Sequence, residues 1–168
     1  MDGAHDFDFI TGNWRVHHRR LKERLVNNHE WVEFGDTMTS HKVLGGFGNI
    51  DDNVLDLPEG AYRALALRAY DPDKNQWSIW WLNGRAPSKI DPPVVGCFEN
   101  GVGTFYGDDT FKGEPIRVRF FWTEVTSSAP HWEQAFSIDG GKTWETNWTM
   151  DFTKLLLSVG NTRPQPDP

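Results

Sequence analysis

The sequence predicts an all-β protein: a closed up-and-down antiparallel barrel of about ten strands, preceded by a short N-terminal helical turn. Short runs of alternating apolar and polar residues recur about every ten residues between turn signals, and no window of helical length keeps a helical apolar period. The 168 residues include nine Trp and eleven Phe, and aromatic residues favour strands and line apolar pockets. A closed barrel is favoured over a sandwich because it leaves no aromatic-rich strand edge free to aggregate.

The expected elements follow one another between recognisable turns. Residues 6–10 should form the helical turn before the first strand. Asn27-Asn28 can adopt positive φ in a tight hairpin, residues 71–75 fit a longer turn, and Asn100-Gly101 separates two short strands. The expected strands cover residues 13–25, 30–38, 41–44, 53–57, 61–70, 76–83, 94–99, 102–107, 116–123, 131–138 and 143–155.

One domain, residues 1–159, accounts for the body of the chain, and the polar, Pro-rich residues 160–168 are expected to form a mobile tail. The single cysteine, Cys97, excludes an intramolecular disulfide. No signal-peptide pattern and no apolar run long enough to cross a membrane is present, so we expect a cytoplasmic protein without a membrane partner. A net charge of -7 argues against binding nucleic acid through its phosphates.

The opening residues, Phe7-Asp8-Phe9-Ile10-Thr11-Gly12-Asn13-Trp14, resemble the F-D-F-x-x-G-x-W opening of bacterial lipocalin-like proteins of unassigned function. Their last three residues are similar to the G-x-W of lipocalins and their calycin relatives. In that superfamily the Trp lies at the closed end of the barrel, and a basic residue from the last strand packs across its ring in a cation–π contact. The resemblance assigns these places to Trp14 and Lys154, and it implies a lipocalin-like barrel with a central cavity open at one end.

The resemblance leaves the activity open. Calycins include carriers of apolar molecules, haem-binding proteins, and enzymes such as phenolic acid decarboxylases and allene oxide cyclases. The haem-binding nitrobindin group carries a G-x-W-x-G-x-G motif and a proximal histidine near the C-terminus. Here Arg15-Val16-His17 follows Trp14 and no histidine follows His131, so no haem is expected.

The remaining motifs predict neither a cofactor nor a metal. Residues 45–53 (GGFGNIDDN) have neither calcium-loop spacing nor the G-x-G-x-x-G pattern, and no two histidines show zinc spacing with a third ligand. This glycine segment could be a gate from which Asn49 or Asp51 reaches a ligand. Residues 137–144 (SIDGGKTW) resemble the Asp-box hairpin of sialidase propellers, where the motif is mainly structural, and one copy does not support a propeller.

Alternation along the first strand predicts which of its side chains enter the barrel. If Trp14 points inward, so do Val16, His18, Arg20 and Lys22. A two-residue loop at Asn27-Asn28 would pair His18 with Thr37 and Arg20 with Gly35, which makes Thr37 a ligand-binding candidate. The apolar residues Leu21, Leu25, Val32 and Phe34 then share the other face, so either a bulge flips the register or the hairpin tip packs this outer face on something, for which a homodimer partner is one candidate.

Three polar residues are candidates for chemistry. His18 can donate or accept a proton near neutral pH, and its structural alternative is a surface or rim histidine. Arg20 suits a carboxylate, phenolate or enolate, and an ion pair with Glu33 or Asp36 is its structural alternative. Glu133 would act with His131 as an acid/base pair if its face of the strand points inward, and otherwise Gln134 and Trp132 face the cavity.

Aromatic residues complete the predicted site. At least one of Trp80 and Trp81 should face the cavity, and Trp148 is assigned inward together with Trp144 and Phe152. The predicted ligand-binding residues are thus Arg20, Thr37, Asn49, Trp80, Trp81 and Trp148, and the catalytic candidates are His18 and Glu133.

These features favour a binding or carrier module for a small, largely aromatic or apolar molecule with an anionic or hydrogen-bonding end. The alternative is a cofactor-free isomerase, cyclase or lyase in which His18 or Glu133 moves a proton and Arg20 stabilises the developing oxyanion. A third hypothesis is a protein-interaction module that uses the 21–34 hairpin.

Overall fold

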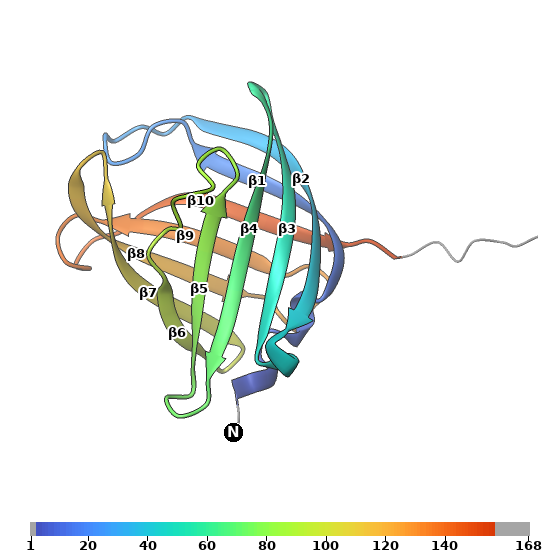
Figure 1. Cartoon of the computed structure of the whole chain (residues 1–168). Coiled ribbons are helices and arrows are strands. Elements are labelled where there is room, and N and C mark those ends of the chain that lie inside the picture. Colours follow the sequence, from blue (N-terminus) through green and yellow to red (C-terminus); the bar gives the residue numbers. More distant parts are fainter. Residues whose placement is uncertain (1–2, 157–168) are drawn as a thin grey trace, which may run out of the picture.

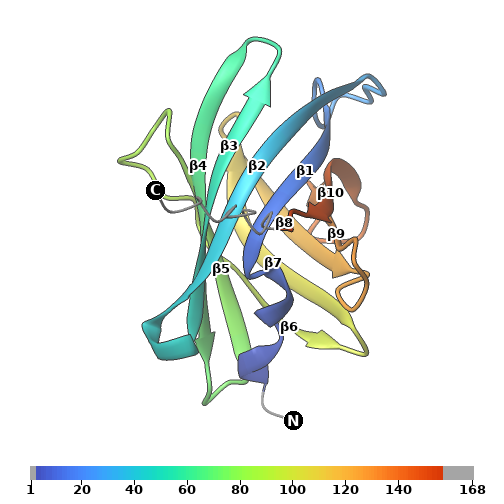
Figure 2. The ribbon, with the colours of Figure 1, turned by 90° about the vertical axis from the view of Figure 1, so that its right-hand side faces the viewer.

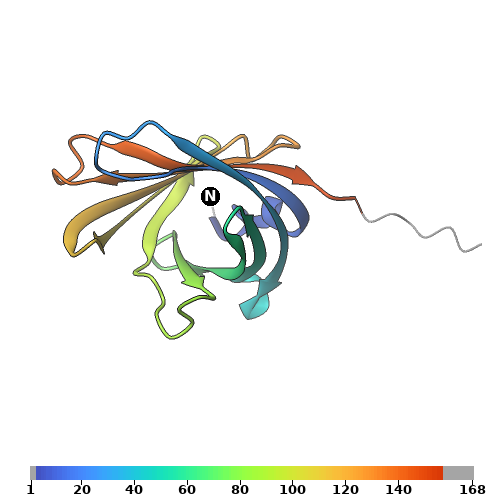
Figure 3. The same ribbon diagram turned by 90° about the horizontal axis from the view of Figure 1, so that it is seen from above.

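Ten antiparallel strands form a closed ring in the computed structural model, which describes residues 3–156 (Figures 1 and 3). Each strand pairs with the next along the chain and the last pairs with the first, so the predicted up-and-down barrel is confirmed. Seen from above, β9, β10 and β1 lie along one side of the ring, and β4 and β5 lie along the opposite side (Figure 3). The strands are β1 (Gly12–Leu21), β2 (Trp31–Val43), β3 (Gly48–Leu57), β4 (Gly60–Asp71), β5 (Gln76–Asn83), β6 (Val94–Glu99), β7 (Val102–Phe111), β8 (Glu114–Thr123), β9 (His131–Ser137) and β10 (Glu145–Lys154).

The short helical segments are all 3-10 turns: η1 (Gly3–His5), η2 (Asp8–Ile10) and η3 (Leu44–Gly46). Within residues 3–156, no helix is long and apolar enough to cross a membrane. The proposed tail, residues 160–168, lies outside the described residues.

The connection between β1 and β2 is longer than the sequence predicted. Strand β1 ends at Leu21 rather than at residue 25, and the Lys22 amide donates to the Glu30 carbonyl at the base of a loop. The predicted strand at 41–44 is instead the end of β2. His18 therefore pairs with Phe34 rather than Thr37, and the predicted pairing of Arg20 with Gly35 is also wrong.

The inward alternation predicted for β1 holds despite this change of register. Trp14, Val16 and His18 are buried and Arg20 is half-buried, whereas the residues between them are exposed. Alternation depends only on the extended backbone, whereas register depends on the length of the loop. Of the apolar residues of the hairpin, Phe34 faces inward, Leu21 is buried, and Leu25 and Val32 pack against the core of the same chain.

The N-terminal turns close one end of the barrel (Figure 2). Phe7 is 1% exposed and makes edge contacts with the rings of Trp77, Phe98 and Trp122. The Trp77 indole N–H donates to the Gly3 carbonyl at 2.9 Å, which ties the first turn to β5. Phe7 and Phe9 thus contribute the apolar contacts that were expected of this segment.

The contact expected between Trp14 and Lys154 is present at this closed end. The Lys154 ammonium lies 4.7 Å from the Trp14 ring centroid and donates to the Thr11 carbonyl at 2.8 Å. The Trp14 indole N–H donates to the Ile10 carbonyl at 2.6 Å. The first and last strands are therefore connected through the residues just before β1, as well as through the pairing of β1 with β10.

The hairpin between β9 and β10 is held by its own side chains. The Asp139 carboxylate accepts from the amides of Lys142 and Thr143, as expected for an Asp-box turn. Trp144 packs against Tyr106 and the Arg119 guanidinium on the outer surface, so its predicted inward orientation is wrong. The register shifts between Thr146 and Trp148, and this bulge turns Asn147 inward, where it is fully buried.

Candidate functional site

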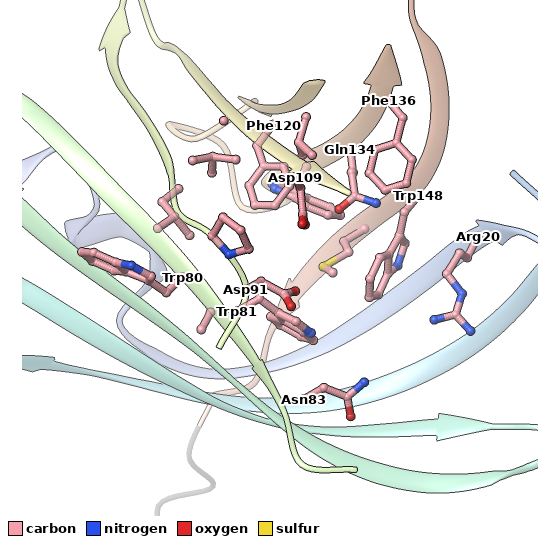
Figure 4. Close-up of a pocket in the computed structure, with 18 of the residues that line it drawn as sticks. Arg20, Trp80, Trp81, Asn83, Asp91, Asp109, Phe120, Gln134, Phe136 and Trp148 are labelled. Carbon is pink, nitrogen blue, oxygen red and sulfur yellow. The ribbon is translucent and has the colours of Figure 1, made fainter. Parts of the chain in front are cut away.

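A cavity of about 370 Å³ lies inside the barrel and opens at the end opposite the N-terminal turns (Figure 4). Its size is near the lower bound for small-molecule pockets in proteins. The middle of the wall is aromatic and comes from four strands, with Trp81 on β5, Phe120 on β8, Trp132 and Phe136 on β9, and Trp148 on β10. The space suits a small molecule with one or two rings.

Two partly buried arginines, Arg20 and Arg24, line the mouth without forming a salt bridge in the described chain. The Arg20 guanidinium lies 5.3 Å from the Phe34 ring centroid and 5.2 Å from that of Trp148, and the Arg24 guanidinium lies 5.7 Å from the ring of Phe136. Within residues 3–156 the arginine ion pairs are made by Arg19, Arg63 and Arg68, not by these two residues. Burial, together with the nearby charge of Arg20, lowers the pKa of Arg24 to about 10, and the nearby Glu145 carboxylate opposes this only in part, so the Arg24 side chain stays cationic at neutral pH.

The loop that carries Arg24 is fixed to the start of the neighbouring strand β10. The Leu25 amide donates to both carboxylate oxygens of Glu145, at 2.8 and 3.1 Å, and Leu25 has a positive φ of 62°. Glu145 begins β10. The loop between β1 and β2 is therefore held at the mouth, where Arg24 faces the cavity.

Acidic residues occupy another side of the mouth. Asp91 and Asp109 line the cavity between the tryptophans and Phe120, and Arg20 stands apart from them beside Trp148 (Figure 4). Burial, and then the charge of Asp109, raises the pKa of Asp91. The Asp91 amide donates to the Trp81 carbonyl at 3.0 Å, which anchors the loop between β5 and β6. Positive and negative groups at the mouth are thus separated rather than paired.

The inner end of the cavity holds a buried ion pair. The Arg68 guanidinium contacts Asp51 at 2.6 Å through Nη2 and donates to the Asn49 side-chain oxygen at 2.8 Å through Nη1. Arg68 is 4% exposed and Asp51 is 1% exposed. The guanidinium also lies 5.0 Å from the Phe7 ring centroid and 5.4 Å from that of Trp122. Arg68 thus links the N-terminal plug to the inner face of β3.

His18 is placed behind the wall and not on the cavity surface. It is fully buried, stacks on Phe34 at 4.6 Å, and accepts a hydrogen bond at Nδ1 from the Trp148 indole at 3.0 Å. Because Nδ1 is an acceptor, the proton of the neutral ring is on Nε2, which donates to Asp36 at 3.4 Å. Burial lowers the pKa of His18 and the bond to Asp36 offsets this only in part. The arrangement orients Trp148 toward the cavity.

Two predicted site residues face away from the cavity. Thr37 is exposed, because the longer loop between β1 and β2 places Phe34, Asp36 and Met38 on the inner face of β2. Glu133 is also outside: its carboxylate pairs with His131 at 3.1 Å, and Gln134 is the buried neighbour that lines the cavity. The alternative that put Gln134 and Trp132 inward is therefore the observed one.

The other predicted binding residues divide into two groups. Arg20, Trp80, Trp81 and Trp148 line the cavity, whereas Asn49 lies behind it and holds Arg68. Trp81 continues the inner face of β5 after Trp77 and Ile79. Trp80 lies on the other face and contacts the cavity where β5 and β6 stop pairing beyond Ile79.

Sequence analysis did not identify Arg24, Arg68 and Asp91 as site residues, although one of them carried a signal. Arg68 alternates in step with Tyr62, Ala64, Ala66 and Tyr70 and so lies on the same, otherwise apolar, face of β4. A charged residue on a buried apolar face is unusual. Arg24 and Asp91 lie in loops, where periodicity gives no orientation. Within residues 3–156, no group of three or more His, Cys, Asp or Glu side chains is arranged to hold a metal ion.

Comparison with known proteins supports the fold. A scan against models of protein families and a search of curated proteins gave no match. Among solved structures the chain is similar to Rv2717c from M. tuberculosis, with a TM-score of 0.61 and 9% sequence identity over 93% of this chain and 99% of that chain. At this identity the likeness shows the fold alone, a closed ten-stranded antiparallel barrel consistent with a lipocalin-like architecture.

Proposed function

We propose that this protein binds a small aromatic molecule in the barrel, with an anionic group of the ligand held at the mouth by Arg20 and Arg24. The observation that carries the proposal is the pair of partly buried guanidiniums that line the cavity, contact its aromatic wall and form no salt bridge within residues 3–156. A guanidinium donates to carboxylate or phosphate oxygens in a fixed fork geometry. The rings of Trp81, Trp132 and Trp148 would contact the body of the ligand.

The proposal includes membership of the calycin superfamily. Support comes from the Gly12-Asn13-Trp14 motif, the Lys154 contact with the Trp14 ring and the closed antiparallel barrel. Members of that superfamily carry ligands in the barrel, which agrees with an aromatic cavity open at one end.

Calorimetric titration with 2-naphthoate and its neutral analogue 2-naphthamide tests the anionic end. We expect the carboxylate to bind about tenfold more tightly, because charge-assisted hydrogen bonds are stronger than neutral ones. The double variant Arg20→Gln/Arg24→Gln should remove this preference. Arg63→Gln is the matched control, because Arg63 is exposed on the same barrel and pairs with Asp52. Failure of both probes to bind, or an unchanged preference in the double variant, would refute the proposal.

Native mass spectrometry of freshly purified protein gives a second test without a chosen probe. A molecule retained from the cell should be an aromatic anion, and it should be absent from the double arginine variant. Recovery of an aliphatic or cationic molecule would contradict the proposal.

A cofactor-free isomerase, cyclase or lyase is the second candidate function. An acid/base group for such a reaction must face the ligand, and neither His18 nor Glu133 does so. The carboxyls that line the cavity are those of Asp51, Asp91, Asp108 and Asp109, and that of Asp51 is already paired with Arg68. The raised pKa of Asp91 suits proton transfer. If the retained molecule is turned over, Asp91→Asn should keep binding and lose turnover, whereas Glu133→Gln should keep both.

A further inference from the structure

The inner end of the cavity contains polar atoms that no part of the described chain satisfies. Arg68 Nε, Trp122 Nε1 and Asp51 Oδ1 are buried without a hydrogen-bond partner within residues 3–156. All three residues line the cavity. Leaving such groups unpaired costs about 1–3 kcal/mol each in general, so buried polar atoms nearly always have a partner.

The three residues that carry these atoms are neighbours around the Arg68 guanidinium. The Asp51 carboxylate contacts Arg68 through its other oxygen at 2.6 Å, and the Arg68 guanidinium lies 5.4 Å from the Trp122 ring centroid. The cluster offers two N–H donors and one carboxylate acceptor. A single hydroxyl group complements it, because its oxygen accepts from the donors while its hydrogen is donated to Asp51.

A second anion does not suit this position. Asp51 already balances the charge of Arg68, and a ligand carboxylate would bring a like charge next to Asp51 in a buried environment. The mouth differs in this respect, because its arginines have no such partner. The two ends of the cavity therefore select different chemical groups.

We infer that the ligand carries an uncharged hydroxyl, phenolic in character, at the end opposite its anionic group, and that Arg68, Asp51 and Trp122 recognise this hydroxyl. The inference rests on the proposed function and names the class of ligand, a hydroxylated aromatic acid. Arg68 pairs with Ile79 on β5, and Asn83 at the mouth is four residues further along, which corresponds to about 13 Å. Two fused aromatic rings with substituents at opposite ends match this length.

A matched series of rigid probes tests the inference on the unaltered protein. Calorimetry would compare 6-hydroxy-2-naphthoate, 2-naphthoate and 6-methoxy-2-naphthoate, which differ only at the inner end. We expect the hydroxyl compound to bind about 10- to 100-fold more tightly than the other two, since the methoxy group has no hydrogen to donate to Asp51. Equal binding of the three would mean that water satisfies the cluster, and the inference would be wrong.

A variant of Trp122 tests whether the cluster of Arg68, Asp51 and Trp122 causes the higher affinity of the hydroxyl compound. Trp122→Phe keeps an aromatic ring at this position and removes one donor, so the advantage in affinity of the hydroxyl compound over 2-naphthoate should shrink about fivefold. Trp144→Phe, on the outer surface, is the matched control and should leave both affinities unchanged. A Trp122→Phe protein that folds and keeps the full advantage would overturn the assignment, and if that variant does not fold the probe series decides alone.

The two proposals fail in different ways. If 2-naphthoate binds but the hydroxyl group does not increase the affinity, the proposed anion site at the mouth is retained and the proposed hydroxyl site at the inner end is wrong. If 2-naphthoate binds no better than 2-naphthamide, a comparison of 2-naphthol with naphthalene still tests the inner site, because neither compound has a carboxylate. If the protein then binds 2-naphthol more tightly than naphthalene, the proposed hydroxyl site is retained and the proposed anion site at the mouth is wrong.

Discussion

Arginines stand on aromatic rings at both ends of the cavity, but their electrostatic surroundings differ. At the inner end Arg68 has a carboxylate at 2.6 Å and an amide oxygen at 2.8 Å, and it is almost inaccessible to solvent. At the mouth Arg20 and Arg24 have aromatic rings and each other as neighbours, without an ion pair in the described chain.

The difference shows that pairing, rather than residue type, determines what an arginine can recognise. A guanidinium that is already neutralised contributes directional hydrogen bonds but little net charge. An unpaired guanidinium at a partly buried mouth attracts anions. One cavity thus combines a charge-selective entrance with a neutral polar inner end.

The largest expected effect comes from breaking the inner pair. Asp51→Asn leaves the Arg68 charge buried without compensation, and we expect the free energy of unfolding to fall by about 3–5 kcal/mol in urea denaturation. The neighbouring Asp52→Asn is the control, since its pair with Arg63 is exposed and should cost less than about 1 kcal/mol. Similar losses for the two variants would remove the distinction between buried and exposed pairs.

Salt should affect the two ends unequally. Raising sodium chloride from about 0.05 M to about 0.5 M should weaken 2-naphthoate binding several-fold, because the mouth is open to solvent and its charges are screened. The ratio of affinities for 6-hydroxy-2-naphthoate and 2-naphthoate should stay constant, because a hydroxyl adds no charge. A ratio that falls with salt would show that the inner end also acts through net charge.

Two histidines, His18 and His131, should make stability depend on pH in opposite directions. Burial lowers the pKa of His18, so unfolding takes up a proton and stability falls as the pH drops below about 6.5. Burial alone would lower the pKa of His131, but the hydrogen bonds that its ring donates to the Asp151 and Glu133 carboxylates outweigh burial and raise the pKa. The contribution of His131 to stability is therefore present below about pH 6.5 and is lost at higher pH. Between about pH 7.5 and 5.5, His18→Gln should reduce the acid-induced loss of stability by about 1 kcal/mol, and His131→Gln should increase it.

Urea denaturation of each variant at several pH values measures these slopes. Equal slopes for wild type and His18→Gln would mean that His18 takes up its proton without unfolding.

The smallest effect concerns a cation outside the cavity. Lys154 lies on the Trp14 ring and is exposed, so Lys154→Met should lower the free energy of unfolding by only about 0.5–1 kcal/mol. Thermal unfolding would measure this, and the affinity for 2-naphthoate should not change. A larger loss, comparable to that of Asp51→Asn, would make the closure of the first and last strands a main source of stability.

Much of the barrel could be predicted because alternation is a local property of the extended chain. The inward set of Trp14, Val16, His18 and Arg20 needed no knowledge of any other strand. The same rule, applied to β4, would have placed Arg68 inside. The rule of alternation fails where the backbone is irregular, as at the bulge in β10, which buries Asn147 next to the buried Trp148.

The sequence by itself determined the class of fold, the inner face of the first strand and the presence of an aromatic interior, because each follows from the period of apolar residues or from composition. Only the tertiary structure decided the register of the first hairpin, the exclusion of His18 from the cavity surface and which arginines form salt bridges. Those outcomes depend on contacts between distant residues, such as the bond from Trp148 to His18 across 130 positions of the chain. Which charges are neutralised is a property of the closed barrel, and no single strand contains it.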